Sequence, residues 1–167
     1  KGLTGGYLPM AATLASTEIY DAFLGTHEQS RTFFHGHTYG GNPLAAAAAM
    51  ASLDVFAEEQ TMAKLPAKIE RIQNNLEKIS RHPNVGDVRQ RGLMIGIELV
   101  QDRETRTPYP WQQARGRRAC DVAVENGVWL RPLGDVIVMM PPLSISPDEV
   151  DQICAAAEEG IFQATSA

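Results

Sequence analysis

The sequence predicts an α/β protein in two parts, a first part at residues 1–57 and a small α+β domain at residues 58–167. Three observations carry this prediction. An alanine-rich helical run occupies residues 43–59, and near residue 60 the pattern changes to a charged amphipathic helix. From residue 85 onward, short apolar runs alternate with helical patterns. Alternating strand and helix patterns of this kind are typical of mixed architectures, in which helices cover a sheet.

The first part opens on a tight turn, K-G-L-T-G-G at residues 1–6, because neighbouring glycines permit backbone conformations that other residues avoid. The apolar run Tyr7–Ala15 predicts a short buried strand, and Ser16 is suited to cap a helix that follows. The polar and unpatterned residues 25–32 predict a loop.

The alanine-rich helix has a strong start signal. Asn42 is a favoured N-cap residue, and Pro43 fits the first helical position because no N–H is needed there. Five successive alanines, residues 45–49, present small side chains all round the helix. Such a helix packs closely on several sides, so we expect it to be buried in a core or at a subunit interface.

The second part begins with an amphipathic helix that starts near residue 60. Apolar residues recur along it at intervals of three and four and predict one buried face, formed by Leu65, Ile69, Ile72, Leu76 and Ile79. Two strands joined at Gly92 follow, with Gly86 and Gly96 as bends or sites of close approach. A surface loop is expected at residues 101–110.

The remaining elements are predicted from their end signals. A helix at residues 111–126 ends at Gly127, which is a favoured C-terminal glycine. Two short strands, Val128–Arg131 and Val136–Met139, follow it. Ser146 then caps a last helix that runs to about Gln163.

Composition narrows the classes of function. The net charge of −5 and a pI near 5.3 argue against nucleic-acid binding, which needs a basic face. No apolar run approaches the roughly 20 residues that span a bilayer, so no membrane association is expected. Cys120 and Cys154 have no metal-like spacing and are expected to be reduced core residues of a cytoplasmic protein. His35 and His37 alternate without a third ligand at a recognisable interval, so no metal site is predicted.

Two stretches indicate chemistry. Lys1 stands at a glycine-rich turn, where a fixed and desolvated amine could form a Schiff base with an aldehyde. Thr38 lies in the glycine-rich loop before the Asn42 cap, and a hydroxyl among free backbone N–H groups beside a helix N-terminus suits a phosphate. An aldehyde with a phosphate handle describes pyridoxal 5'-phosphate.

The same stretches resemble a known family. The lysine turn and the run H-G-H-T-Y-G-G-N-P at residues 35–43 resemble two motifs of the class III aminotransferases, which are pyridoxal phosphate enzymes of fold type I. The runs at residues 85–100 and 127–143 continue the resemblance in the expected order, so it covers essentially the whole chain. The K-G-L-T-G-G-Y-L-P, T-P-Y-P and L-R-P-L-G-D runs are most similar to the branch of the family that acts in biotin synthesis.

The resemblance implies a role for each matching residue. Lys1 would bind the cofactor covalently and then carry the proton of the reaction, with a depressed pKa. Thr38, with Gly36 and His37, would hold the phosphate of the cofactor bound by the partner subunit, so that a homodimer shares its sites. Arg131 would bind the carboxylate of the substrate, and Gly36 would also contribute to substrate binding. The alternative for Arg131 is a structural salt bridge to a buried aspartate or glutamate.

The resemblance also implies a reaction and its limits. The reaction is transfer of an amino group from S-adenosylmethionine to 8-amino-7-oxononanoate, with lysine as an alternative donor. The enzymatic alternative is another ω-amino acid or diamine transaminase. The non-enzymatic alternative is a dimerisation or scaffold fragment. The aspartate that pairs with the cofactor ring and the aromatic that stacks on it would both precede residue 1. We therefore expect the chain to be the C-terminal part of a longer fold type I protein, comprising the end of its large domain and its small domain, and to be inactive alone.

Overall fold

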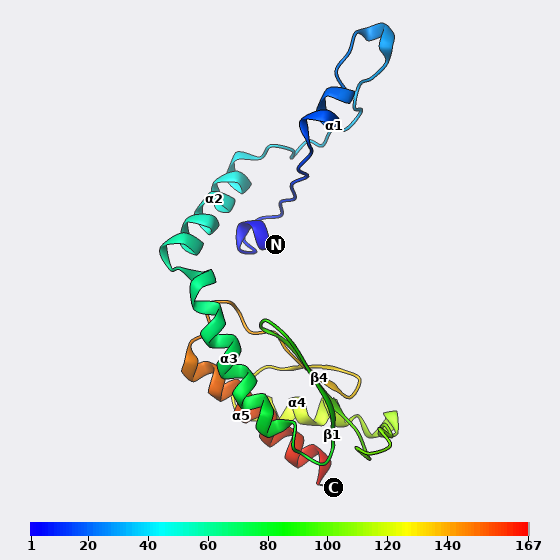
Figure 1. Ribbon diagram of the computed structural model, residues 1–167, viewed down its shortest axis with the longest axis vertical. Helices are drawn as coiled ribbons and strands as arrows, with labels where there is room; N and C mark the ends of the chain where they lie inside the picture. Colours follow the sequence, from blue (N-terminus) through cyan, green and yellow to red (C-terminus); the bar gives the residue numbers. More distant parts are fainter. Residues whose placement is uncertain (167) are drawn as a thin grey trace. The chain divides into compact units, whose positions relative to one another are not determined.

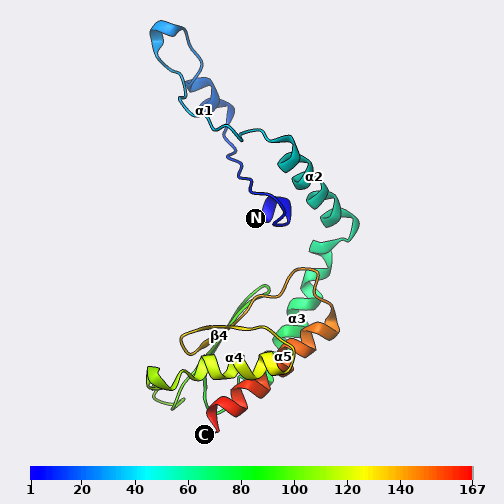
Figure 2. The same cartoon turned by 180° about the vertical axis from the view of Figure 1, so that it is seen from behind.

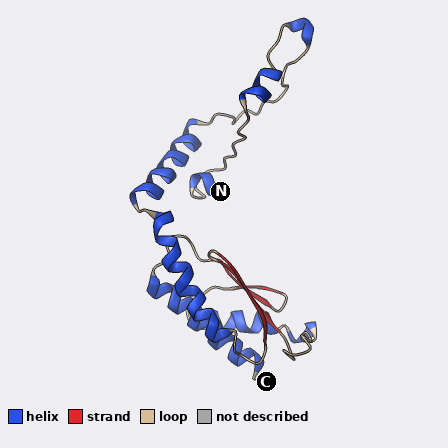
Figure 3. Cartoon of the chain, viewed as in Figure 1, coloured by secondary structure: helices blue, strands red, loops and turns tan. Residues whose placement is uncertain are grey.

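The computed structural model describes residues 1–166, which form two compact units, residues 1–60 and a second unit from Thr61 on. Figure 1 labels the elements along the chain, and Figure 3 shows that all strands lie in the second unit. The helices are α1 (Thr17–Ala22), α2 (Pro43–Glu58), α3 (Thr61–Ile79), α4 (Arg115–Glu125) and α5 (Pro147–Thr165). Three short 3-10 helices are η1 (Gly2–Thr4), η2 (His27–Gln29) and η3 (Trp111–Gln113). The strands are β1 (Val85–Arg91), β2 (Met94–Leu99), β3 (Arg131–Leu133) and β4 (Val136–Met139).

In the first unit, the turn at the N-terminus packs beside α2 (Figures 1 and 2). The predicted caps are confirmed, because the Ser16 side chain accepts a hydrogen bond from the Ile19 N–H and Asn42 accepts one from the Leu44 N–H. The strand predicted at Tyr7–Ala15 is wrong. This segment has no regular secondary structure and is exposed except for the half-buried Leu8, and residues 1–60 hold no strand with which it could pair.

Helix α2 is also less covered than its alanines predict. Of its residues only Ala45 is buried within the chain, at 3% exposure. Large apolar side chains elsewhere in the unit are exposed as well, among them Phe34 at 92% and Leu14 at 97%. No described residue covers these side chains, so the first unit has little core of its own.

The second unit is a four-stranded antiparallel sheet in the order β1-β2-β4-β3, with α3, α4 and α5 packed on one face. Alternate residues of the central strands point into this core, namely Ile95, Ile97, Leu99, Ile137 and Met139. The predicted face of α3 is confirmed, since Ile72, Leu76 and Ile79 are buried and Leu65 and Ile69 pack against the core.

Two boundaries in this unit differ from the prediction. The helix expected at residues 111–126 is broken by Ala114, whose φ of 47° is left-handed, so η3 and α4 are separate. The strand expected at Val128–Arg131 begins only at Arg131. The reason is that the Val128 N–H donates to the Ala123 carbonyl at 2.9 Å, which ties this segment to the end of α4.

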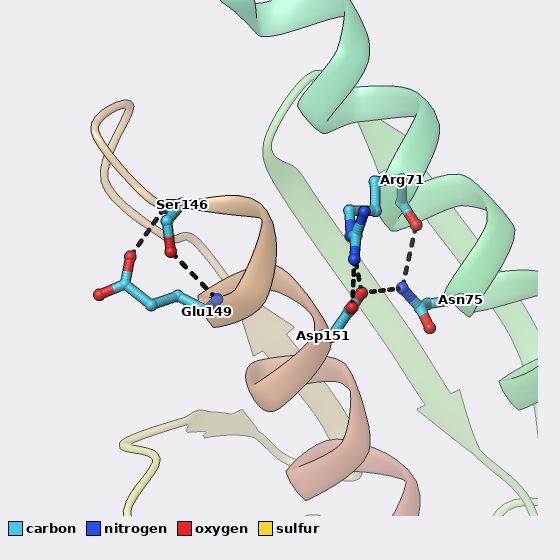
Figure 4. A network of polar contacts seen from close by, with 5 residues as sticks. All are labelled: Arg71, Asn75, Ser146, Glu149 and Asp151. Atoms are coloured by element: carbon cyan, nitrogen blue, oxygen red, sulfur yellow. Dashed lines mark hydrogen bonds and ion pairs between the residues drawn. The ribbon is translucent and has the colours of Figure 1, made fainter.

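Helices α3 and α5 lie side by side and are joined by a polar network (Figure 4). The Arg71 guanidinium and the Asn75 amide both donate to the Asp151 carboxylate, and these hydrogen bonds hold the pKa of Asp151 below its usual value. At the start of α5, Ser146 and Glu149 form a capping box, and the hydrogen bonds from Ser146 lower the pKa of Glu149.

Candidate functional site

The backbone of Lys1 is fixed at the start of η1. Its carbonyl accepts hydrogen bonds from the Thr4 N–H at 3.2 Å and from the Gly6 N–H at 2.9 Å. Gly5 and Gly6 close the turn with φ values of 60° and 86°, which glycine adopts without strain. The prediction of a tight turn beside the lysine is therefore confirmed.

Thr4 anchors this turn. Its side chain is 1% exposed, and its hydroxyl donates to the Leu8 carbonyl. A side chain at Gly5 would approach the Ser52 hydroxyl at 3.9 Å, so the turn lies directly against α2. The buried threonine was not singled out from the sequence, although its place between two glycine positions is the signal that could have indicated it.

The Lys1 side chain itself is exposed, and no described residue covers it. The sequence argument expects a desolvated amine, because the neutral form is the nucleophile. Within this chain the turn fixes the backbone of Lys1 but provides no walls around its amine, so desolvation of the amine stays a prediction.

The segment before α2 is a pair of successive turns. The Gly40 N–H donates to the His37 carbonyl at 2.8 Å, and the Asn42 N–H donates to the Tyr39 carbonyl at 3.3 Å. The His37 ring nitrogen Nδ1 accepts a hydrogen bond from the Tyr39 N–H at 3.2 Å, which orients this imidazole. Both turns lead directly into the first turn of α2.

Gly36, His37 and Thr38 lie at the beginning of these turns and are all exposed. Among the described residues nothing hydrogen-bonds the Thr38 hydroxyl, and a side chain at Gly36 would meet no atom within 4 Å. The hydroxyl is therefore accessible, and the backbone around Gly36 borders open space. These are the properties that the phosphate-site prediction needs.

Arg131 is the first residue of β3 in the second unit. The sequence argument expects it to be buried between apolar neighbours, but the side chain is exposed because β3 is an edge strand. Opposite Val138 in the antiparallel register, Arg131 shares the face of the sheet that the helices leave open. No salt bridge engages it among residues 1–166, which removes the structural ion-pair alternative within this part of the chain.

Arg131 also borders a groove between α4 and the segment that leads into β3. The other residues of this groove are Arg117, Cys120, Asp121, Val124, Trp129, Leu130 and Pro132. Trp129 is 86% exposed, and Arg117 pairs with Asp121 at 2.8 Å. Trp129 lies two residues before Arg131, and this spacing is the sequence signal that could have placed both near this groove.

The candidate residues thus fall into two groups, Lys1 with Gly36, His37 and Thr38 in the first unit and Arg131 in the second. Among the described residues, no group of three histidine, cysteine, aspartate or glutamate side chains could hold a metal ion. None of the described helices is long and apolar enough to cross a membrane.

The family model for class III aminotransferases matches residues 1–161 of this chain. The chain belongs to the class III aminotransferases. Members of this family depend on pyridoxal phosphate, and the fold of this member agrees with a fragment of an α/β fold type I protein.

Individual members of the family are similar along nearly the whole chain. The adenosylmethionine-8-amino-7-oxononanoate aminotransferase of Nitratidesulfovibrio vulgaris is 53% identical over 99% of this chain and 30% of its own length. That of Geobacter sulfurreducens is 48% identical over 99% of this chain and 36% of its own length. The crystal structure of the Methanocaldococcus jannaschii enzyme is 46% identical, with a TM-score of 0.88, over 96% of this chain and 37% of its own. This class III aminotransferase chain therefore spans about a third of the length of its relatives.

The side chains of Lys1 and Thr38 have the chemistry and the accessibility that binding of pyridoxal phosphate requires. The amine of Lys1 is accessible on a fixed turn, and the hydroxyl of Thr38 is accessible beside a glycine with open space around it. An amine suits the aldehyde of the cofactor, and a hydroxyl with backbone N–H groups suits its phosphate.

Proposed function

We propose that this chain acts within a longer aminotransferase of biotin synthesis, which moves an amino group from S-adenosylmethionine to 8-amino-7-oxononanoate and yields 7,8-diaminononanoate. The observation that carries this proposal is the identity of 46–53% to relatives that bear the name of this enzyme, over 96–99% of the chain. When bound, pyridoxal phosphate accepts an amino group from one substrate and passes it to the next by drawing electrons from the reacting carbon.

Lys1 holds the cofactor through its amine in this proposal. Once free, Nζ of Lys1 would act as base and then as acid, taking a proton from the substrate carbon and delivering it to the carbon of the cofactor. The fixed backbone of the η1 turn supports this role, because proton transfer requires a constant position of the amine. The walls that exclude water from Lys1 must come from residues outside the first unit.

Thr38 and the backbone of Gly36 and His37 hold the cofactor phosphate, and Gly36 also leaves room for the substrate. In the proposed homodimer these residues serve the site of the partner subunit. The exposure of the Thr38 hydroxyl supports this arrangement, as do the exposed apolar side chains of the first unit, which include Phe33, Phe34, Leu44 and Leu53.

Arg131 binds the distal carboxylate of 8-amino-7-oxononanoate. Its planar guanidinium can meet a carboxylate through two parallel hydrogen bonds, and among the described residues it has no competing acidic partner. Trp129 and the other apolar residues of the groove beside it suit the carbon chain of such a substrate. The buried and free thiols of Cys120 and Cys154 support our placement of the protein in the reducing cytoplasm.

A single-turnover half-reaction tests the substrates. A full-length protein containing this sequence is loaded with cofactor, and its absorption is followed after addition of S-adenosylmethionine, lysine, β-alanine, ornithine or putrescine. We expect S-adenosylmethionine to change the absorption and 8-amino-7-oxononanoate to restore it. If only lysine or an ω-amine acts, the substrate assignment fails. If the protein dimerises but retains no cofactor, it is a scaffold and the enzymatic proposal fails.

Mixed dimers test the shared site. Lys1→Ala and Thr38→Ala variants are each impaired, but a heterodimer of the two has one site in which both residues are intact. Random mixing places half of the chains in heterodimers, so activity should rise to about a quarter of the wild-type value on C2 symmetry. If mixing restores nothing while ultracentrifugation shows that subunits exchange, Lys1 and Thr38 serve the same subunit.

A further inference from the structure

The strand that carries Arg131 is weakly held by its own pairing. β3 has three residues and lies at the edge of the sheet, where β4 is its only neighbouring strand. Its register places Arg131 opposite Val138 and Leu133 opposite Val136. Short edge strands gain few ladder hydrogen bonds, so the position of Arg131 depends on what fixes the β3–β4 turn.

Asp135 fixes that turn from two sides. Its carbonyl accepts a hydrogen bond from the Leu99 N–H at 2.9 Å, which ties the turn to the end of β2. Its carboxylate oxygen Oδ1 accepts one from the Gly116 N–H at 2.9 Å, which ties the turn to the first turn of α4. Gly134 completes the turn with a φ of 60°.

The first turn of α4 needs this carboxylate. The residue at its N-cap position is Ala114, whose side chain cannot accept a hydrogen bond. The N–H groups at the start of a helix have no partner within the helix, and a carboxylate there is favourable to the helix dipole as well. Asp135 therefore provides, from a distant segment, the acceptor that a capping side chain would provide locally.

Gly116 allows the turn to approach this closely. A Cβ atom at this position would lie 2.3 Å from the Gly134 carbonyl oxygen and 2.9 Å from the Asp135 Cα. Since these are backbone atoms, they could not move aside without displacing the turn. The backbones of α4 and of the β3–β4 turn are therefore in direct contact, with the Asp135 carboxylate across the contact.

We infer that Asp135 is a positioning residue for Arg131, and that it acts by clamping the β3–β4 turn to the start of α4. This inference rests on the proposed function, in which Arg131 binds the substrate carboxylate. Only three residues separate Arg131 from Asp135 along the hairpin, and Arg131 borders the groove whose other wall is α4. A turn released from α4 shifts the backbone of β3, and with it the guanidinium of Arg131 on the open face of the sheet.

Steady-state kinetics of the full-length holoenzyme test this inference. Asp135→Ala should raise KM for 8-amino-7-oxononanoate about tenfold, because small displacements of a binding group are costly. The rate of the half-reaction with S-adenosylmethionine should stay unchanged. Asp135→Asn should retain a wild-type KM, since the amide oxygen still accepts from the Gly116 N–H.

Two further variants separate positioning from loss of stability. Ser146→Ala removes the cap of α5 far from the hairpin, so it should lower Tm without raising KM. Asp135→Glu keeps the charge but displaces it by one methylene, so it should raise KM less than Asp135→Ala does. It also provides a test of the inference if Asp135→Ala folds poorly. Hydrogen exchange gives a readout without activity, and in Asp135→Ala the amides of residues 131–139 should exchange faster.

The outcomes distinguish this inference from the proposed function. If Arg131→Ala leaves KM for 8-amino-7-oxononanoate unchanged, the carboxylate role of Arg131 is wrong. If Arg131→Ala raises KM but Asp135→Ala does not, the inference about Asp135 is wrong and the proposed function stands. An Asp135→Asn variant as impaired as Asp135→Ala would also overturn the clamp, because its hydrogen bond would then be irrelevant.

Discussion

Lys1 joins a fixed backbone to an accessible side chain. The carbonyl is held by two backbone N–H groups, and the neighbouring Thr4 is buried against α2. Residues other than Lys1 thus fix the position of its backbone. In the proposed function Lys1 supplies the reactive amine, so its reactivity can be changed without changing the turn.

Replacing Lys1 by arginine in a full-length protein should abolish transamination, by about 10³-fold or more, because a guanidinium stays protonated and cannot act as nucleophile or base. The substitution keeps the positive charge and leaves the turn intact. The measurement is the half-reaction with S-adenosylmethionine. The matched control is Lys64→Arg, at an exposed position of α3. Activity within a few-fold of wild type in Lys1→Arg would contradict the role of this lysine.

The two cysteines should make stability depend on pH in the alkaline range. Burial raises the pKa of Cys120 and that of Cys154 from 9.0 to about 11. The unfolded chain then loses these protons at lower pH than the folded chain does. Their contribution is fully present below pH 9 and is lost as pH rises towards 11.

Urea unfolding at pH 8 and pH 10 measures this effect. In the wild type, the urea concentration at the midpoint of unfolding should be lower at pH 10 than at pH 8. The decrease should be smaller in a Cys120→Ala, Cys154→Ala double variant. An equal decrease of the midpoint from pH 8 to pH 10 in both proteins would show that the thiols ionise alike in the folded and unfolded chains.

At the scale of elements, the sequence predicts helices better than strands. Caps such as Ser16, Asn42 and Ser146 act on N–H groups two or three residues away, so the signal and its effect are both local. A strand needs a neighbour that the local sequence does not show. The apolar run at residues 7–15 has the composition of a strand but no partner, and β3 begins late because Val128 is tied to α4.

The same difference applies to the candidate site. Lys1, Thr38 and Arg131 could be proposed because each belongs to a short motif that resembles a family pattern. The contact between Asp135 and Gly116 was not found, because it joins residues that come together only when the hairpin packs on α4. The exposure of Lys1 and Arg131 was also missed, since motifs carry no information on what covers a side chain.

Helix α5 packs against α4 through Gly160, which sets the distance between the two. A Cβ atom at Gly160 would lie 2.3 Å from the Ala119 carbonyl oxygen. Gly160→Ala should therefore destabilise the second unit by about 3 kcal/mol, despite the better helix propensity of alanine. Thermal unfolding measures this, with the exposed neighbour Glu159→Ala as control. A Gly160→Ala variant as stable as wild type would mean that the helices separate at little cost.

For the molecule as a whole, the two units differ in how they are stabilised. Every residue of the main core cluster lies between Ile72 and Ala164. The first unit buries little besides Thr4 and Ala45. Stability should therefore belong to the second unit, whereas the first unit depends on surfaces outside it.

A fragment of residues 61–167 should fold by itself, because it contains the whole core cluster. We expect dispersed amide resonances and one cooperative urea transition. A fragment of residues 1–60 should show neither, since its apolar side chains have no core to enter. Loss of cooperative unfolding in the longer fragment would show that the first unit stabilises the second.

The exposed aromatic side chains of the first unit also bear on synthesis. This unit leaves the ribosome before the second one, yet only the second has a core that can form from its own residues. Phe33 and Phe34 are 62% and 92% exposed even in the folded chain, so during elongation they have no core to enter and resemble the segments that chaperones bind. The nascent chain should need protection until its apolar surface is covered, so the supply of chaperone, and not the stability of the finished fold, would limit its yield.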